Sequence, residues 1–386
     1  MTLRILYSFP HAIGAPGIGV TALNQVRALR SAGADVTVVA TSVHPGTDLP
    51  GAVETLVVFG RRLPHRAFGS VERAFRFHDR RVASMVSRGD FDVVHAWPLG
   101  ALRTLRAAHE QGILGTREAP NSHTAAAYAV AEAEAARIGV PIPKGQSHHQ
   151  DAGRLDRERA EYDAAALILV PSEHVEQSFL AQGVPAAKLA RHQYGYDPSG
   201  FDAVGRDDSG GRPFTALFLG SAEPRKGLHY ALEAWRASGV DGVFLIAGRF
   251  APGYRERLGT ELDDPGVRTL GFVSDTADLL RSADVLLLPS VEEGSALVTY
   301  EALATGCIPL VSRASGSHVT DGVDGMLHDA GDVDALAAQL SQLRGDGAMR
   351  DRMRAAGIAA SADLTWDAAG RRMIELFTDA RDRSRA

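Results

Sequence analysis

The sequence has almost no cysteine and no long apolar run. Cys307 is the only cysteine in 386 residues, which excludes an intramolecular disulfide and fits a reducing cytoplasm. No stretch reaches the roughly 18 apolar residues that a transmembrane helix needs, and residues 1–10 run directly into a strand pattern. We therefore expect a cytoplasmic protein that is neither secreted nor spans a membrane.

The chain also lacks a strong excess of either charge. Its net charge is −6, which gives no general attraction to nucleic acid or to an anionic membrane, and we expect no nucleic-acid partner. With 45% hydrophobic and 23% charged residues, the composition is that of an ordinary globular protein. A length of 386 residues exceeds one typical domain and suggests two or three.

Short apolar strand patterns alternate with amphipathic helix patterns along the chain. This order, with fully apolar strands, indicates parallel sheets covered by helices on both faces. A stretch rich in Gly, Asp, Ser and Pro at 193–213 indicates a linker. We therefore predict an α/β protein with two doubly wound, Rossmann-like domains facing each other across a cleft. The expected strands are 4–9, 35–41, 54–59, 91–97 and 166–172, then 215–220, 243–248, 267–272, 284–290 and 308–312.

Open parallel sheets bind ligands at the carboxyl ends of their strands, and the first loop there is rich in glycine. It contains Gly14, Gly17 and Gly19, and the helix after it offers free N–H groups to an anion. The loop lacks the Gly-x-Gly-x-x-Gly spacing of a dinucleotide site, and the second strand lacks the acidic residue that would hold an NAD ribose. Anion binding and a purely structural turn remain the two interpretations.

Two adjacent cations follow the strand expected at 215–220. Arg225 and Lys226 lie where the next helix is expected to begin, so two side-chain charges and the helix dipole converge at one point. This combination suits a diphosphate. The alternative is a solvated Arg-Lys pair.

Two glutamates follow the strand expected at 284–290. We expect Glu293 in the turn and Glu301 inside the next helix, with Ser295 near its N-cap and Gly306 past its end. Eight helical positions give roughly 12 Å of rise, whereas the carboxylates of a glycoside hydrolase work across roughly 5 to 9.5 Å. The spacing suits two separate hydroxyl-bearing parts of a longer ligand. Alternatively, Glu301 faces solvent and Glu293 is a charge near a helix N-terminus.

A series of motifs after the linker resembles the donor-binding half of the retaining family 4 glycosyltransferases, which have the GT-B fold. Between about 214 and 370 the matching pieces are "LGSAEPRKG", "FLIAGRF", "VRTLGFVSD", "LLLPSVEEGSALVTYEALATGCIPLVSRASGSHVTDGVDGMLHDAGD" and "LTWDAAGRRMIELF". The half before the linker resembles the family more weakly, through the glycine loop, "FDVVHAW" and "EYDAAALILVPSEHVEQSF". The resemblance implies transfer of a hexose-type sugar from a nucleoside-diphosphate sugar to an unidentified acceptor (a glycan, glycolipid or small metabolite), without a metal or other cofactor.

The resemblance also assigns roles to residues. Glu293 matches the glutamate that contacts donor-sugar hydroxyls, and Glu301 matches the one that contacts the nucleotide ribose. Arg225 and Lys226 match the cationic pair on the donor diphosphate, and His123 resembles the histidine near the transferred sugar. We expect the other donor-binding positions to act mainly through their backbone, and these are Gly17, Gly19, Val273, Gly294, Ser295, Ala296 and Leu297.

One departure from the family pattern concerns the cations. Many members have Gly-Arg directly after the strand and a lysine further on. This chain has Gly220-Ser221 there and places both cations together at 225 and 226, as some members do. The phosphate role is retained, but which cation faces which phosphate stays open.

The resemblance further implies that the chain is divided into three parts. Residues 1–197 would form the acceptor-binding domain, 198–365 the donor-binding domain, and 366–386 a helix that crosses back to pack on the first domain. This arrangement would place hinges near 195–210 and around 365.

Two segments of the first half carry additional hypotheses. Residues 61–88 hold eight arginines against Glu72 and Asp79, a net charge of +6, interleaved with aromatic and aliphatic residues. They fit a peripheral membrane helix at the inner membrane face, a cradle for an anionic acceptor, or a solvated helix that packs its Phe residues inward. The segment 139–151 contains His148, His149 and Asp151, which we interpret as a polar loop rather than a metal site.

Other functional classes are compatible with parts of these patterns. The same architecture houses pseudo-glycosyltransferases that join cyclitols and sugar-nucleotide 2-epimerases. A non-catalytic sugar-nucleotide sensor would keep the fold without the reaction. A dehydrogenase would show nicotinamide spectral changes on binding.

Overall fold

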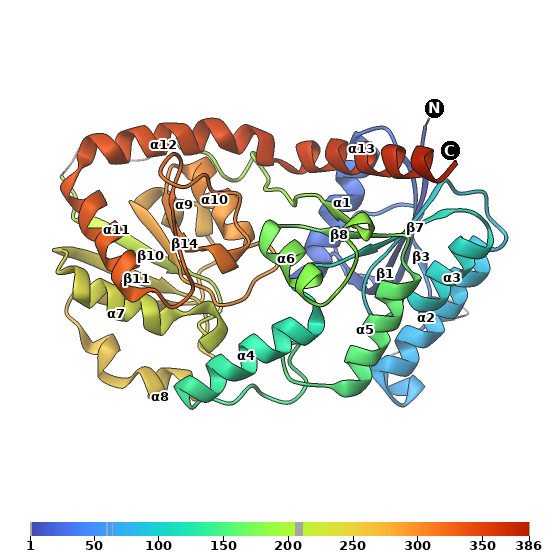
Figure 1. Ribbon diagram of the computed structural model, residues 1–386, viewed down its shortest axis with the longest axis horizontal. Coiled ribbons are helices and arrows are strands. Elements are labelled where there is room, and N and C mark those ends of the chain that lie inside the picture. The colour runs from blue at the N-terminus through green and yellow to red at the C-terminus, as the bar shows by residue number, and fades with distance from the viewer. Residues whose placement is uncertain (1, 59–60, 64, 205–210, 386) are drawn as a thin grey trace.

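The computed structural model describes residues 2–58, 61–63, 65–204 and 211–385, and two parallel sheets dominate it (Figure 1). The strands of the first sheet are β1 (Arg4–Ile13), β2 (Asp35–Val43), β3 (Val53–Glu54), β6 (Val93–Ala96), β7 (Leu114–Glu118), β8 (Leu167–Val170) and β9 (Leu189–Arg191). The strands of the second are β10 (Phe214–Leu219), β11 (Gly242–Ala247), β12 (Val267–Gly271), β13 (Val285–Leu288), β14 (Ile308–Ser312) and β15 (Met326–His328). A short antiparallel pair joins β4 (Val57–Val58) to β5 (Arg61–Arg62).

Helices cover both sheets. Those of the N-terminal domain are α1 (Ile18–Ser31), α2 (Val71–Val86), α3 (Leu102–Glu110), α4 (Thr124–Ile138), α5 (Ala152–Ala164) and α6 (Glu173–Ala181). Those of the C-terminal domain are α7 (Leu228–Ser238), α8 (Tyr254–Leu258), α9 (Thr276–Ser282), α10 (Leu297–Thr305), α11 (Val333–Gly345) and α12 (Gly347–Ser361), followed by α13 (Trp366–Arg385).

Both sheets are doubly wound. The first has the order β3-β2-β1-β6-β7-β8-β9 and the second β12-β11-β10-β13-β14-β15, with parallel pairing throughout each. In each, the strand order reverses next to the first strand, and this switch point is where an open parallel sheet binds its ligand. The predicted fold class, two Rossmann-like domains of the GT-B type, is confirmed.

The predicted strands fit the structure where the apolar runs are long. The strand expected at 308–312 is reproduced with the same bounds, because it is buried on both faces. The strand expected at 267–272 ends one residue earlier, although Arg268 and Leu270 on it are exposed. The run 54–59 was expected as one strand, but its described part, residues 54–58, contains the end of β3 and the short β4 with a break between them. Neither β9 nor β15 was predicted, because three-residue edge strands leave almost no pattern.

The final helix α13 returns to the N-terminal domain, as predicted, and runs along α1 (Figure 1). Its Met373 and Phe377 belong to the apolar core of that domain. Where the chain crosses, Tyr196 N donates to Leu364 O at 3.1 Å and Trp366 N donates to Tyr196 O at 3.3 Å. The two crossing segments are therefore tied to each other.

A second connection crosses between the domains through α4, on the side of the molecule opposite α13 (Figure 1). Ile138 at its end and Val140 just after it are buried in the apolar core of the C-terminal domain. Arg257 Nε also donates to Ile138 O at 2.9 Å. The helix α4 thus begins beside one sheet and ends in the core of the other domain.

Candidate active site

Arg225 and Lys226 lie at the carboxyl end of β10, in a 3₁₀ turn of residues Pro224–Lys226. The structure differs from the expectation that they open the helix, because Gly227 separates this turn from α7. Gly227 has φ of +71°, and a Cβ there would overlap the carbonyl of Pro289, which follows β13. Only glycine therefore allows the turn to approach the end of β13 this closely. The two cations are thereby held beside the loop after β13.

Glu293 joins both cations. Its Oε1 lies 3.1 Å from Arg225 Nη1 and is also paired with Lys226 Nζ. Burial alone would raise the pKa of Glu293, but the charges of Arg225 and Lys226 outweigh it and lower that pKa. An ionised carboxylate and two cations therefore meet at one point, although they lie nearly seventy positions apart in the sequence.

Glu301 lies on α10, apart from this ion-pair cluster. Within the described part of the chain its carboxylate makes no ion pair, and burial raises its pKa to about 7. The carboxyl group is thus poised between its neutral and charged forms at physiological pH. The predicted contacts of Glu293 and Glu301 with two different parts of a ligand stay a prediction.

The segment between the two glutamates is docked against the N-terminal domain. Ser172 Oγ donates to Gly294 O at 2.6 Å, and a Cβ on Gly294 would overlap the carbonyl oxygen of Pro120. Ser295 was expected near the helix cap, but Ala296 is the N-cap of α10 and Ser295 instead shares a 2.7 Å hydrogen bond with the Tyr300 hydroxyl. The backbone N–H groups at the start of α10 are therefore not satisfied by a side-chain cap.

Glu292 is a buried carboxylate that the sequence analysis did not single out. It is 1% exposed and accepts hydrogen bonds from Ser122 N at 3.3 Å and from His148 Nε2 at 2.8 Å. Burial would raise its pKa, but the hydrogen bond from His148 and the charge of Arg225 lower that pKa to about 2. The signal in the sequence was the doublet of acidic residues directly after a buried strand.

His123 lies on the N-terminal wall of the cleft, one residue after Ser122. It is the N-cap of α4, where Nδ1 accepts from Ala125 N at 3.3 Å, and its ring packs against Tyr162 and Phe179. Burial, followed by the nearby charges of Arg159 and Arg117, lowers the pKa of His123 to about 4. The imidazole is therefore neutral at physiological pH, and its backbone is tied to Glu292 through the neighbouring residue.

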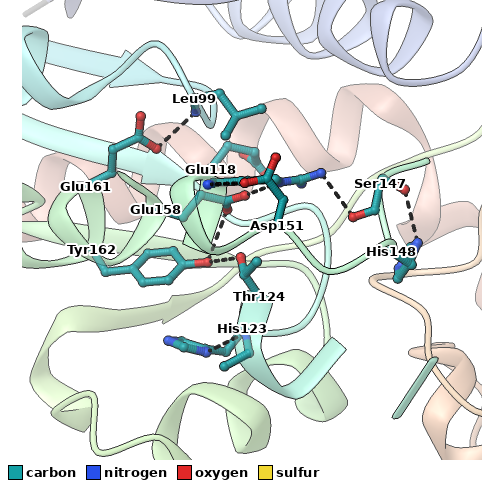
Figure 2. A network of polar contacts seen from close by, with 12 residues as sticks. Leu99, Glu118, His123, Thr124, Ser147, His148, Asp151, Glu158, Glu161 and Tyr162 are labelled. Carbon is teal, nitrogen blue, oxygen red and sulfur yellow. Dashed lines mark hydrogen bonds and ion pairs between the residues drawn. The ribbon is translucent and has the colours of Figure 1, made fainter. Parts of the chain in front are cut away.

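A buried charge network supports this wall (Figure 2). Arg117 Nη2 pairs with Glu158 at 2.7 Å and its Nε with Glu161 at 3.2 Å, while Tyr162 bonds both Thr124 and Glu158. Glu161 also accepts from the backbone N–H groups of Leu99 and Ala101. The network fixes the loops after β6 and β7, which face the cleft, onto α5.

The remaining predicted donor-binding positions lie on two separate elements. Gly17 is the N-cap of α1 with φ of +83°, and a Cβ on Gly19 would come within 2.7 Å of Ala12 O. Val273 follows β12 and is partly buried against an apolar cluster of the C-terminal domain. The structure places all three after the carboxyl ends of strands, but no contact joins them to Glu293 within the described residues.

The histidine-rich loop does not converge on one point. His148 faces Glu292, His149 Nδ1 bonds Gln150 O, and Asp151 caps α5 through Arg154 N. Among the described residues, no group of three or more His, Cys, Asp or Glu side chains is arranged to hold a metal ion.

The arginine-rich segment forms α2, whose inner face contains Phe75 and Asp79. Asp79 is 5% exposed and accepts from the backbone N–H groups of Arg103 and Thr104, so it caps α3 instead of balancing the surface charge. The outer face carries exposed arginines and Val71, which is 44% exposed. No helix in the described ranges is long and apolar enough to cross a membrane.

Known proteins match both halves of the chain. The family model described as Glycosyltransferase Family 4 matches residues 16–199, and the one described as Glycosyl transferases group 1 matches residues 213–346. The phosphatidyl-myo-inositol mannosyltransferase of Mycolicibacterium smegmatis is 30% identical over 381 residues, which cover 94% of this chain and 89% of that protein. The chain belongs to glycosyltransferase family 4. This family 4 enzyme therefore transfers a sugar from a nucleotide-sugar donor.

Other similarities are either partial or limited to the fold. A D-inositol 3-phosphate glycosyltransferase of Thermomonospora curvata is 34% identical, but over 35% of this chain and 33% of its own length. Sucrose-phosphate synthase from Thermosynechococcus elongatus superposes with a TM-score of 0.72 at 18% identity, covering 99% of this chain and all of that one. Anabaena Alr3699/HepE, in complex with UDP and glucose, superposes with a TM-score of 0.68 at 16% identity, covering 98% of this chain.

Proposed function

We propose that this family 4 glycosyltransferase moves a hexose, with retention of configuration, from a nucleoside-diphosphate sugar to an acceptor bound by the N-terminal domain. The observation that carries the proposal is the convergence of Arg225, Lys226 and Glu293 at the carboxyl edge of the second sheet. Two cations suit the donor diphosphate, and the carboxylate suits the sugar hydroxyls. Before donor binds, both cations are paired with Glu293.

The chemistry explains why cations are needed at this point. As the bond between the anomeric carbon and the diphosphate oxygen breaks, negative charge grows on the leaving diphosphate, and fixed positive groups stabilise it. The acceptor hydroxyl then attacks from the same side, and its proton passes to a diphosphate oxygen. Arg225 and Lys226 together with the uncapped N–H groups of α10 would hold that charge in place.

His123 would contact the transferred sugar as a neutral imidazole. Its Nδ1 is engaged by the start of α4, and its lowered pKa keeps the ring uncharged. A neutral ring can accept a hydrogen bond from a sugar hydroxyl or donate one to it, and it does not attract the leaving diphosphate. The cationic half of the site thus stays on the C-terminal wall.

The acceptor would lie on the N-terminal side. A cavity of ≈ 580 Å³ is lined there by Phe75 on α2, by Leu99 and by Arg154 and Arg157 on α5. A larger one of ≈ 680 Å³, between α3 and α5, opens at the amino ends of β7 and β8, away from the site residues. Because relatives are named for phosphatidyl-myo-inositol and D-inositol 3-phosphate, inositols and their phosphates are the first acceptors to test.

A thermal-shift panel of UDP-, GDP- and ADP-sugars tests the proposal first. We expect one class of nucleotide sugar to raise the unfolding midpoint, because a ligand that binds only the folded state stabilises it. If no nucleotide sugar raises the unfolding midpoint, the result contradicts the assignment. The donor found in this way serves in every assay below.

The binding of that donor should depend on pH through Glu301. An ionised carboxylate can accept hydrogen bonds from both ribose hydroxyls, and with a pKa of about 7 this form dominates only above pH 7. We expect the donor affinity to rise severalfold from pH 6 to pH 8, a range in which the diphosphate of a nucleotide sugar does not titrate. Isothermal titration calorimetry with Glu301→Gln should show weaker binding at pH 8 and a flat profile; an unchanged slope would remove Glu301 from the ribose site.

We also propose that α2 contacts an anionic membrane surface, which would make the enzyme peripheral at the cytoplasmic face. Arg73, Arg76 and Arg80 are exposed on the outer face of this helix, next to the exposed Val71. Because Asp79 is consumed in capping α3, little negative charge opposes them. Basic residues near an anionic surface each contribute about 1 kcal/mol of attraction.

The membrane contact is tested by co-sedimentation with phosphatidylglycerol vesicles. We expect wild-type protein to bind at low salt, and the combined Arg73→Gln, Arg76→Gln and Arg80→Gln variant to bind roughly 100-fold more weakly, from about 1 kcal/mol per residue. The matched control replaces three arginines at 352, 371 and 372, which lie exposed on α12 and α13. Equal losses in both variants would show only a general charge effect.

A further inference from the structure

Glu292 ties the two walls of the cleft together. Of its partners, Ser122 and His148 belong to the N-terminal domain, and Arg225 belongs to the C-terminal domain, with Nη1 at 3.5 Å from the Glu292 carboxylate. A carboxylate that is 1% exposed is tolerated only when its charge is paired and hydrogen-bonded. Two of its three partners, Ser122 and His148, are present only while the two domains are in contact.

Each partner of Glu292 is connected to a part of the proposed reaction site. Ser122 precedes His123, so its backbone position sets that of the histidine. His148 lies in the segment 139–151 that links α4 to α5, and it stands at the edge of the buried network (Figure 2). Arg225 also donates to the Glu292 backbone oxygen at 2.5 Å, which fixes the guanidinium next to Glu293.

We propose that Glu292 is a positioning residue for the transfer reaction. It holds the His123 loop and the segment 139–151 against Arg225, so that the donor and acceptor walls meet in their reactive arrangement. This inference rests on the proposed function of the site. It assigns Glu292 no contact with the substrate. Its effect passes through Ser122, His148 and Arg225.

Other contacts between the same walls lie farther from the predicted chemistry. Glu134 on α4 pairs with His229 on α7 at 2.8 Å, and Arg257 reaches the end of α4. These contacts would keep α4 docked after Glu292 is altered. Loss of the Glu292 contacts should therefore loosen the loops at the reaction site without separating the domains.

The test variant is Glu292→Gln, which keeps the size of the side chain and removes its charge. The amide can still accept from Ser122 N, but it cannot also accept from His148 and neutralise Arg225. The matched comparison is Glu223→Gln, because Glu223 Oε1 pairs with Arg225 Nη2 at 2.7 Å from within the same domain. Both variants remove one negative charge from Arg225, but only the first weakens the contact between the walls, because it alters the pairing with His148.

At saturating donor concentration, the rate of nucleotide release should be at least tenfold lower in Glu292→Gln than in the wild-type protein. The KM for donor should stay within about threefold of the wild-type value. In Glu223→Gln we expect the KM for donor to change instead of the rate of nucleotide release. Hydrogen-deuterium exchange of the free protein should be faster at residues 120–123 and 141–150 in Glu292→Gln and unchanged there in Glu223→Gln. Slower turnover with unaltered exchange at both segments, or equal kinetic losses in the two variants, would overturn the proposal.

His148→Asn provides a second route to the same contact, since the His148 side chain is 14% exposed and Glu292 keeps Arg225 and Ser122 N as partners after the replacement. It should reproduce the faster exchange at 141–150, and normal exchange there would also count against the proposal. If no nucleotide sugar binds the wild-type protein, the proposed function fails, but the exchange measurement still decides whether Glu292 holds the walls together.

Discussion

Replacement of Lys226 by alanine is expected to abolish sugar transfer while leaving the protein folded. Lys226 and Arg225 are the cations that meet at Glu293, and in the proposed reaction both charges stabilise the leaving diphosphate as its bond to the sugar breaks. Removal of one such preorganised group slows a reaction by roughly 10²- to 10³-fold. The measurement is the rate of nucleotide release from the donor that stabilises the wild-type protein most.

The fold should survive because Glu293 keeps a partner. After Lys226→Ala its carboxylate still lies 3.1 Å from Arg225 Nη1, so no buried charge is left unpaired. The unfolding midpoint should therefore stay within a few degrees of wild type. Arg352→Ala, which removes an exposed positive charge from α12, should leave turnover unchanged. Near-normal transfer by purified Lys226→Ala would remove this pair from the reaction.

Replacement of Gly294 by alanine should have the next largest effect. Its backbone does not need a positive φ, so a side chain is excluded by its neighbours alone: the added Cβ would overlap the carbonyl oxygen of Pro120 on the opposite domain. The methyl group should push the two walls apart by enough to misalign the reacting groups. A displacement of about 1 Å can lower a rate by roughly 10²-fold.

The Gly294→Ala measurement combines turnover with small-angle scattering. We expect slower nucleotide release, a slightly larger radius of gyration and little change in the unfolding midpoint, because each domain keeps its own core. Gly345→Ala is the matched control, since a Cβ at the end of α11 would meet nothing within 4 Å. Wild-type turnover in Gly294→Ala would show that the reaction does not require this contact between domains.

Much of the site could be predicted because it depends on local order along the chain. A buried strand followed by a turn and a helix places Glu293 at the carboxyl edge of a sheet wherever the rest of the protein lies. The same reasoning placed Arg225 and Lys226 at the same edge, since the strands β10 and β13 that precede them are neighbours. The exact capping was less predictable: Ser295 bonds Tyr300 because that hydroxyl is buried beside it, and no local rule favours that choice over a cap.

What could not be predicted depends on contacts between distant segments. Glu292 pairs with Ser122 and His148, which are 170 and 144 residues away, and the acidic doublet after the strand does not by itself show which partners it has. The charge of Asp79 was counted against the arginines of α2, but its burial against α3 takes it off the surface. Likewise, only the packing of Ile138 and Val140 shows that α4 ends in the core of the other domain.

The sequence by itself determined two parallel-sheet domains, the membership of the family and the position of Arg225, Lys226 and Glu293 after the carboxyl ends of strands, because alternating apolar patterns and loops after strands are local properties of the chain. Tertiary structure alone decided how the two walls meet. The closeness of Gly294 to Pro120 and the hydrogen bond from His148 that helps to keep Glu292 ionised arise at the contact between domains. The ring of His123 is kept neutral by burial against Tyr162 and Phe179 of its own domain. Burial and charge pairing act through space, so only the folded chain brings the groups that set them into contact.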